Sequence, residues 1–312
     1  MSAGDNLEAV DIDVRCASCG IAEVDNFQSK NCDDCDLVKY CSDACQQNHR
    51  SQHEAKCKER AAELCDEILF QQPESSHHGD CPICCLPIPL GKNKFATMSC
   101  CSKMICEGCI YTDKYRQYDA KGQMRDFQLK CLFCRHTLPK TQQEGLQNLM
   151  KRVAASDPLA TSLMGSAHSE EGDHERAFKY FTKAAELGDA DAHYGLSLMY
   201  KEGGGIDKDQ VKEIHHLEEA SIRGHPYARH NLGCYEENRG RIDRAVKHYI
   251  IAANLGCDES LQALKEWYDY NELVSKDDFA AALRAHHAAV KATISPQRAA
   301  AAKAYSQITW AK

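Results

Sequence analysis

Two small cysteine-rich modules followed by an all-α solenoid of helical hairpin repeats are the fold class that the sequence predicts. Three observations lead to this prediction. Seventeen of the 19 cysteines fall between Cys16 and Cys134. Most of them form C-x-x-C pairs, a spacing that suits a tetrahedral metal ion better than a disulfide framework. After Thr141 cysteine becomes rare, and similar segments that end in glycine recur at nearly regular intervals, which indicates stacked repeats.

The composition excludes several classes of function. The 312 residues leave room for two or three modules, and no apolar run is long enough to predict a membrane span. The acidic N-terminus lacks the apolar region of a secretory signal, which favours thiols in the cytoplasm or nucleus over disulfides. The formal net charge is −8. Fifteen metal-bound thiolates and four divalent ions would shift it to about −15. A chain this acidic has no general affinity for nucleic acid, so its expected partners are proteins.

The first cysteine block has the spacing of two metal sites. C-x-x-C pairs close two thiolates onto one ion, while C-x-x-x-C and H-x-x-x-C place two ligands one turn apart on a helix. Eight ligands make two zinc sites, and each zinc supplies on the order of 10–16 kcal/mol of folding free energy. His49 is the only competitor for the histidine position. The candidate ligands are Cys16, Cys19, Cys32, Cys35, Cys41, Cys45, His53 and Cys57.

This block resembles the MYND zinc finger over residues 16–57, most clearly in the segment YCSDACQQNHRSQHEAKC. The resemblance implies interleaved binding, with Cys16, Cys19, Cys41 and Cys45 on one zinc and Cys32, Cys35, His53 and Cys57 on the other. MYND fingers typically bind short proline-containing peptides. Arg50 replaces the tryptophan that is usual on the C-terminal helix, so the groove should hold apolar peptides less well.

Residues 58–80 are expected to form a helix, from Lys58 to Phe70, and then a polar linker. Cys65 lies on the helical pattern with Ile68 and Leu69 and is expected to be an ordinary buried cysteine. His77 and His78 in the linker are expected to be solvated.

The second cysteine block contains three C-x-x-C pairs, and Cys100 with Cys101 is the only candidate pair to complete a second site. This block resembles an all-cysteine RING finger over residues 81–138, in which Lys103 takes the usual histidine position. The implied cross-brace has Cys81, Cys84, Cys106 and Cys109 on one zinc and Cys100, Cys101, Cys131 and Cys134 on the other. Adjacent cysteines strain the backbone, so Cys85 or a water could replace one of them.

Two residues bear on the function of a RING-type module. In ubiquitin ligases of this type, an apolar residue at the position of Ile83 packs onto the ubiquitin-conjugating enzyme, and an arginine at the position of Arg135 holds ubiquitin's tail. Such a ligase positions its partners and has no nucleophile of its own, so no catalytic residue is expected. A non-enzymatic scaffold is the alternative, which Lys103 and the apolar residues of CLFC favour. A SET-domain methyltransferase is excluded because no SET core or N-H-S-C motif is present.

The remaining chain predicts helices. TQQE begins a connecting helix over residues 141–155 with a capping box. Gly188, Gly224 and Gly256 end three successive units, because glycine readily takes the positive φ of a helix C-cap. These units resemble SEL-one-like repeats, which are related to tetratricopeptide repeats, over residues 157–257. The resemblance implies a concave protein-binding surface.

The C-terminal end of the array is expected to be irregular. A degenerate fourth hairpin would extend the repeat region to residues 157–293 and cap it, and the tail 294–312 is expected to be a frayed helix or disordered. The helical histidine pairs are expected to be surface or packing residues: His215, His216, His286 and His287.

Overall fold

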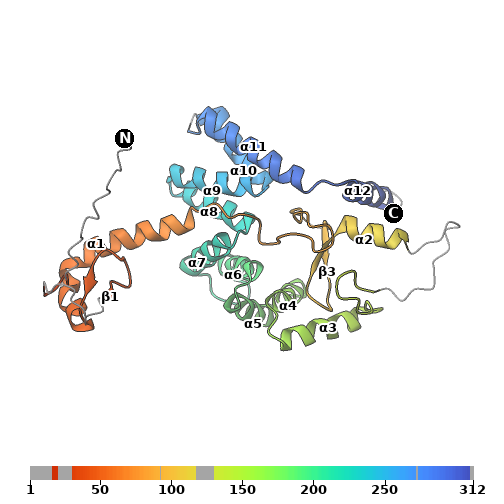
Figure 1. Cartoon of the computed structure of the whole chain (residues 1–312), viewed down its shortest axis with the longest axis horizontal. Coiled ribbons are helices and arrows are strands. Elements are labelled where there is room, and N and C mark those ends of the chain that lie inside the picture. The colour runs from red at the N-terminus through yellow and green to blue at the C-terminus, as the bar shows by residue number, and fades with distance from the viewer. Residues whose placement is uncertain (1–15, 20–29, 92, 117–129, 272, 310–312) are drawn as a thin grey trace, which may run out of the picture. The chain divides into compact units, whose positions relative to one another are not determined.

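The computed structural model describes residues 16–19, 30–91, 93–116, 130–271 and 273–309 of the chain. The fold is mainly helical (Figure 1). The chain divides into two compact units, residues 1–71 and residues 72–312. Each unit is described by itself.

The first unit holds the first cysteine block and one long helix. Strands β1 (Lys30–Asn31) and β2 (Lys39–Tyr40) pair antiparallel, and helix α1 spans Asp43–Leu69. The Ser42 hydroxyl caps α1 by accepting from the Cys45 amide. The helix predicted from Lys58 is therefore the second half of one longer helix. The expectation that Cys65 is buried was wrong, because its side chain is exposed on α1.

The second unit begins with the linker and the second cysteine module, residues 80–138. Strands β3 (Phe95–Thr97) and β4 (Met104–Cys106) form an antiparallel hairpin, and helix α2 (Glu107–Arg116) follows directly. The core of this module is small. Ile88 and Ile105 are 2% and 0% exposed and pack among cysteines, so bound metal must supply much of the stability.

Three helical hairpins, each built from two helices of 13 residues, form the centre of the array. They are α4 (Pro158–Glu170) with α5 (His174–Glu186), α6 (Ala190–Glu202) with α7 (Gln210–Ile222), and α8 (Pro226–Asn238) with α9 (Ile242–Asn254). Gly188, Gly224 and Gly256 have φ of 86°, 81° and 91°, as the repeat pattern predicts. The residue after the glycine caps the following helix in two of these units. The Asp189 side chain caps α6, and the His225 side chain caps α8.

A bulky residue of each second helix packs against small residues of its neighbours. Phe181 is 5% exposed, and a Cβ atom added to Gly165 of α4 or Gly195 of α6 would lie 2.7 or 2.9 Å from its ring. Leu217 and Tyr249 take the same place in the next two hairpins and are also buried. The small residues therefore allow the helices to approach closely.

Helix α3 (Gln142–Ala154) takes the place of the second helix of a hairpin, and the described residues 130–141 before it form no helix. It lies one repeat before α5 in the sequence and has the same length. Ser156, with φ of 56°, follows α3 at the position where Gly188 follows α5. The position of buried Ala184 is taken by Arg152, which pairs with Asp157. A charged residue on this face closes the N-terminal end of the array, as capping elements of repeat proteins do.

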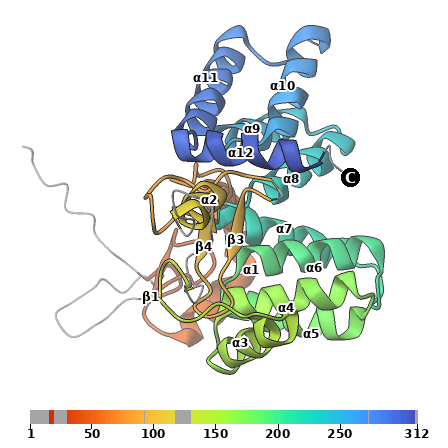
Figure 2. The same cartoon turned by 90° about the vertical axis from the view of Figure 1, so that its right-hand side faces the viewer.

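The C-terminal end departs from expectation. The degenerate hairpin is formed by α10 (Asp258–Asn271) and α11 (Lys276–Ala292). The tail, however, forms helix α12 (Pro296–Thr309). Ala301 in α12 is 0% exposed, and α12 packs against α2 of the second cysteine module (Figure 2). Of the two alternatives expected for the tail, the helix is the one present over the described residues 296–309. It docks on α2 instead of fraying, through a surface that the sequence pattern does not reveal.

Candidate metal centres

The first cysteine block forms two four-residue clusters with interleaved ligands. One contains Cys16, Cys19, Cys41 and Cys45, and the other contains Cys32, Cys35, His53 and Cys57. In each cluster the potential ligand atoms lie within 4.8 Å of one another. His53 Nε2 lies 3.1 Å from Cys35 Sγ. His49 lies outside the cluster, where its Nδ1 is 3.1 Å from the Tyr40 hydroxyl.

The second cysteine module also forms two clusters. They are Cys81, Cys84, Cys106 and Cys109, and Cys100, Cys101, Cys131 and Cys134. Cys100 and Cys101 thus both reach one cluster, with Cys100 Sγ 3.4 Å from Cys134 Sγ and Cys101 Sγ 3.8 Å from Cys131 Sγ. Cys85 is exposed and belongs to neither cluster.

The spacing of the sulfur atoms fits zinc. Contacts between sulfurs range from 3.3 Å for Cys41 and Cys45 to 4.0 Å for Cys81 and Cys109. A tetrahedron with Zn–S bonds of about 2.3 Å has edges of about 3.8 Å, whereas a disulfide needs about 2.05 Å. Sets of Cys₄ and Cys₃His are those of structural zinc sites. The described residues therefore offer one cluster for each of the four expected zinc ions.

A recurring turn prepares three of the C-x-x-C pairs. Asp36, Cys85 and Arg135 each follow the second cysteine and have φ of 54°, 53° and 62°. The amide of each donates to the carbonyl of the first cysteine, at 3.1, 2.8 and 3.0 Å. This turn points both thiols of a pair to the same side before a metal binds.

The same turn explains how adjacent cysteines share one cluster. Ser102 has φ of 54°, and its amide donates to the Met98 carbonyl at 2.8 Å. Met98 therefore takes the place of the first cysteine of a C-x-x-C turn and Cys101 that of the second. Cys100 lies between them. The positive φ at Ser102 belongs to this turn, as it does at Asp36, Cys85 and Arg135, and does not result from the two cysteines being adjacent.

The electrostatics of the clusters favour a bound cation. Burial raises the pKa of Cys16, but hydrogen bonds from the backbone amides of Cys19, Cys41 and Ser18 outweigh this effect and lower the pKa to about 6. Burial and contacts with Cys32 and Cys35 raise the pKa of Cys57 to about 12. Crowded thiols keep their protons until a cation replaces them, so zinc binding at these clusters releases protons.

Arg298 connects α12 to the metal cluster that contains Cys84. Its Nη2 donates to Cys84 Sγ at 3.4 Å and to the Leu86 carbonyl at 3.2 Å. Its Nη1 donates to the carbonyls of Pro87 and Thr293 at 2.6 and 2.7 Å. Gly108 lies between the candidate ligands Cys106 and Cys109, and a Cβ atom there would come within 2.7 Å of the Arg298 backbone nitrogen. Sequence reasoning missed this arginine, because it lies near the opposite end of the chain from Cys84.

The two residues considered for ubiquitin transfer lie at the surface of the second module. Ile83 is 40% exposed, and Phe133, which has the same place in the last C-x-x-C turn, is 46% exposed. Arg135 is exposed beside Cys134. Lys103 Nζ lies 5.7 Å from the centroid of the Phe133 ring, a cation–π distance. These side chains are accessible to a partner.

The linker histidines contradict the expectation that they are solvated. The His77 side chain is 6% exposed, and its Nε2 lies 3.0 Å from Asp191 Oδ1. His225 Nε2 lies 3.4 Å from the same oxygen. Burial lowers the pKa of His78 to about 4. The two histidines are shielded because this part of the linker packs on the repeats, which sequence spacing does not show.

His77, Asp191 and His225 could in principle hold a metal ion, but the tautomer of His225 favours a hydrogen-bonded cluster. His225 Nδ1 accepts from the Ala228 amide at 3.1 Å, so the proton lies on Nε2 and is donated to Asp191. A metal on Nε2 would require a proton on Nδ1 and would remove this helix cap. Hydrogen bonds from His225 and His77 hold the pKa of Asp191 well below its usual value despite burial.

The linker follows the turns that join successive hairpins. The His77 amide donates to the Gly224 carbonyl at 3.0 Å. A Cβ atom at Gly224 would lie 2.7 Å from the Ser75 carbonyl. One turn further along the array, Asn254 donates to Gln72 at 3.0 Å. One edge of the repeat array therefore holds the linker that leads into the second cysteine module.

Four cysteine-rich clusters ahead of stacked hairpins define this chain as a zinc-finger and helical-repeat protein. The MYND finger family profile matches residues 16–57. The Sel1 repeat profile matches residues 159–189, 190–225 and 226–257. The chain therefore contains a zinc-binding MYND finger and three Sel1 repeats, which together support a role in protein interaction. Among the described residues, no helix is both long and apolar enough to cross a membrane.

The similar proteins share only part of the chain. DAP3-binding cell death enhancer 1 from rat is 29% identical over 72 residues, which are 23% of this chain and 14% of that protein. Chitin synthase regulatory factor 4 from fission yeast is 30% identical over 86 residues, 27% of this chain and 14% of that protein. The chain thus spans about a seventh of the length of these relatives.

Two solved structures are similar as well. A Sel1 repeat protein from Oxalobacter formigenes matches 50% of this chain and 67% of its own, with 27% identity and a TM-score of 0.43. A protective antigen of uropathogenic Escherichia coli with an SLR fold matches 47% of this chain and 33% of its own, with 25% identity and a TM-score of 0.39.

Proposed function

We propose that this protein is a zinc-dependent adaptor of the cytoplasm or nucleus, in which the MYND finger and the second cysteine module each present a docking surface for other proteins. The Sel1 repeats hold the second module and offer a further surface. Free thiols in four metal clusters support a reducing compartment.

The observation that carries this proposal is the attachment of the second module to the repeats. His77 joins the linker to Asp191 and His225 of two different hairpins, and Arg298 joins α12 to the module. An attached module presents its exposed Ile83 and Phe133 in a fixed position relative to the repeats. A partner that contacts both surfaces would gain from this preorganisation.

Co-capture of partners tests the adaptor. Three baits would be used: the zinc-loaded protein, a Cys16→Ser/Cys19→Ser variant and a Cys131→Ser/Cys134→Ser variant. We expect each double variant to lose a different set of partners, and the intact protein to hold both sets in the same complexes. An intact bait that retains no protein above the level of an unrelated zinc protein would contradict the proposal.

A finer proposal concerns the second module. We propose that it is a RING-type module that recruits a ubiquitin-conjugating enzyme through Ile83 and positions ubiquitin through Arg135. The exposure of both side chains supports this role. The module would act by holding the charged conjugating enzyme in a reactive geometry.

Autoubiquitination across a panel of conjugating enzymes tests the ligase. Ile83→Ala should lower the rate about tenfold or more, because it removes an apolar contact at the centre of the interface. Leu187→Ala, an exposed leucine on the repeats, should leave the rate unchanged. Absence of ubiquitin transfer with every enzyme of the panel would refute the ligase and leave the adaptor standing.

A further inference from the structure

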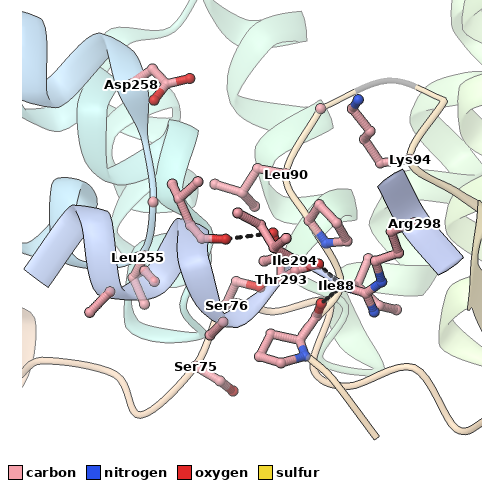
Figure 3. Close-up of a pocket in the computed structure, with 18 of the residues that line it drawn as sticks. Ser75, Ser76, Ile88, Leu90, Lys94, Leu255, Asp258, Thr293, Ile294 and Arg298 are labelled. Carbon is pink, nitrogen blue, oxygen red and sulfur yellow. Dashed lines mark hydrogen bonds between the residues drawn. The ribbon is translucent and has the colours of Figure 1, made fainter. Parts of the chain in front are cut away.

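A cavity of about 840 Å³ lies beside the second cysteine module, and no candidate metal ligand lines it. Its walls come from three parts of the second unit (Figure 3). The linker and the start of the second module form one wall, the turn between α9 and α10 forms another, and α11 with α12 forms the third. Cavities of about 300–1,000 Å³ are typical of ligand sites.

The walls are largely apolar and open to solvent. Pro87, Pro89, Leu90 and Leu255 line the cavity. Ile294 is 64% exposed and adds to the apolar lining. On α11, alanines three and four residues apart leave space that larger residues would fill: Ala285, Ala288, Ala289 and Ala292.

The rim is acidic. Glu74, Asp258 and Glu259 are exposed at its edge, and the Asp258 side chain remains 87% exposed although its Oδ1 lies 2.9 Å from His286 Nε2. Lys94 is the only exposed cation among the lining residues that the structure describes. The other lining cation, Arg298, donates to Cys84 and to three carbonyls. The rim therefore attracts positive charge.

We propose that this groove binds a short peptide segment of a partner protein, with one or two apolar anchor side chains beside a lysine or arginine. The inference rests on the proposed adaptor function and gives it a specific site. The chain's own N-terminus is a poor occupant, since residues 1–14 hold four acidic residues and no lysine or arginine. The acidic rim favours a positively charged partner, and the apolar walls favour one that carries apolar side chains.

The groove depends on the folded second module. Arg298 attaches α12 to Leu86 and Pro87, beside the wall that contains Leu90. Cys84, a candidate zinc ligand, accepts from the same guanidinium. Removal of zinc should therefore release one wall from the other and abolish peptide binding.

The test uses full-length zinc-loaded protein and two fluorescent peptides. Both peptides carry two leucines four residues apart, flanked in one by lysines and in the other by glutamates. Fluorescence anisotropy should show binding of the lysine peptide that weakens as salt is raised. Ala288→Phe, which fills the groove, should weaken binding about tenfold or more, an effect of about 1.4 kcal/mol. Glu74→Lys should weaken it several-fold and reduce the salt dependence.

Matched variants control for general damage. The controls are Ala300→Phe, at an exposed position of α12 outside the cavity, and Glu186→Lys, at an exposed position of α5. Both should bind like the unaltered protein. Ala292→Phe provides a second groove-filling variant should Ala288→Phe lose zinc or helical structure.

Several results would overturn the proposal. They are failure of both peptides to bind, equal binding of the glutamate peptide, and normal binding by both groove-filling variants. A concentration-dependent dimer that Ala288→Phe dissociates would instead make the groove an interface between copies. Co-capture by the two fingers is measured separately, so the adaptor can survive the loss of this site.

Discussion

At the scale of single residues, Arg298 is the side chain that joins two distant parts of the chain. We expect Arg298→Met to speed zinc release from one of the four sites about tenfold or more, because it removes the donor to Cys84 Sγ and the links to Leu86 and Pro87. Loss of an outer hydrogen bond to a metal ligand typically has an effect of this size. A chelator that changes colour on binding zinc would resolve the faster phase.

The control for this prediction is Arg284→Met, an exposed arginine on α11, which should release zinc at the normal rate. Arg298→Lys should release zinc at an intermediate rate, since an ammonium can make some of these hydrogen bonds but fewer than the guanidinium fork. Four unchanged release phases in Arg298→Met would show that this arginine only packs against the module.

Arg50 bears on what the MYND finger can bind. A cavity of about 370 Å³ on this finger is lined by Arg50 and Tyr40 and by the acidic residues Asp33, Asp34 and Asp43. This charged lining agrees with the expected loss of affinity for apolar peptides. We expect Arg50→Trp to bind a proline-containing peptide more tightly, by about fivefold or more, because an aromatic wall adds apolar contact area. Isothermal titration would measure the change.

The comparison for this second prediction is Arg50→Ala. It removes the charge without adding a ring, so it should gain little affinity. Equal gains in the two variants would show that repulsion by the guanidinium, and not the missing ring, limits binding. Zinc content should be the same in both, because Arg50 is not in a metal cluster.

At the scale of elements, the packing of Phe181 between hairpins sets the stability of the array. Phe181→Ala should lower the free energy of unfolding by about 3–5 kcal/mol, because it leaves a cavity between α4, α5 and α6. Urea unfolding followed by circular dichroism would measure the loss. Leu187→Ala, whose side chain is 42% exposed, should change it by less than about 0.5 kcal/mol. A similar loss in both variants would contradict the packing argument.

The same scale shows what could be predicted from the sequence. The C-x-x-C pairs and the hairpins follow from local spacing, because C-x-x-C turns and glycine caps are set by neighbouring residues. Which pairs share a metal ion was implied by the resemblance to known zinc fingers. The roles of His77 and Arg298 depend on contacts with Asp191 and Cys84, which are far away in the sequence. No periodicity or motif marks such contacts. The docking of the helix over residues 296–309 was missed for the same reason, since its partner α2 belongs to the second cysteine module.

At the scale of the whole molecule, the two units should respond differently to the loss of metal. The core of the first unit consists of Cys16, Cys32 and Cys35 with Tyr40, so little apolar packing remains without zinc. The repeats have metal-independent cores around Phe181 and around Tyr249. After chelation we expect fast hydrogen exchange over residues 30–57 and continued protection over residues 177–199, measured by mass spectrometry. Equal loss of protection would contradict independent stabilisation of the units.

Acid should weaken the repeat array through histidines that are neutral in the folded state. Burial lowers the pKa of His193, His216 and His225 to about 4, whereas an unfolded histidine has a pKa of about 6.5. Between these values the unfolded state binds more protons, so stability falls as the pH drops below about 6.5. Each neutral histidine contributes about 1.4 kcal/mol per pH unit.

Zinc release at low pH also lowers stability, so a variant must separate histidine protonation from zinc loss. His216→Gln can keep a hydrogen bond to His193, whose Nδ1 lies 3.1 Å from that of His216, but cannot take up the proton. Its urea midpoint should therefore fall less steeply between about pH 6.5 and pH 5 than that of the unaltered protein. His287→Gln, exposed on α11, should keep the original slope. If all three slopes coincide, zinc loss alone accounts for the acid sensitivity, and the buried histidines do not contribute to it.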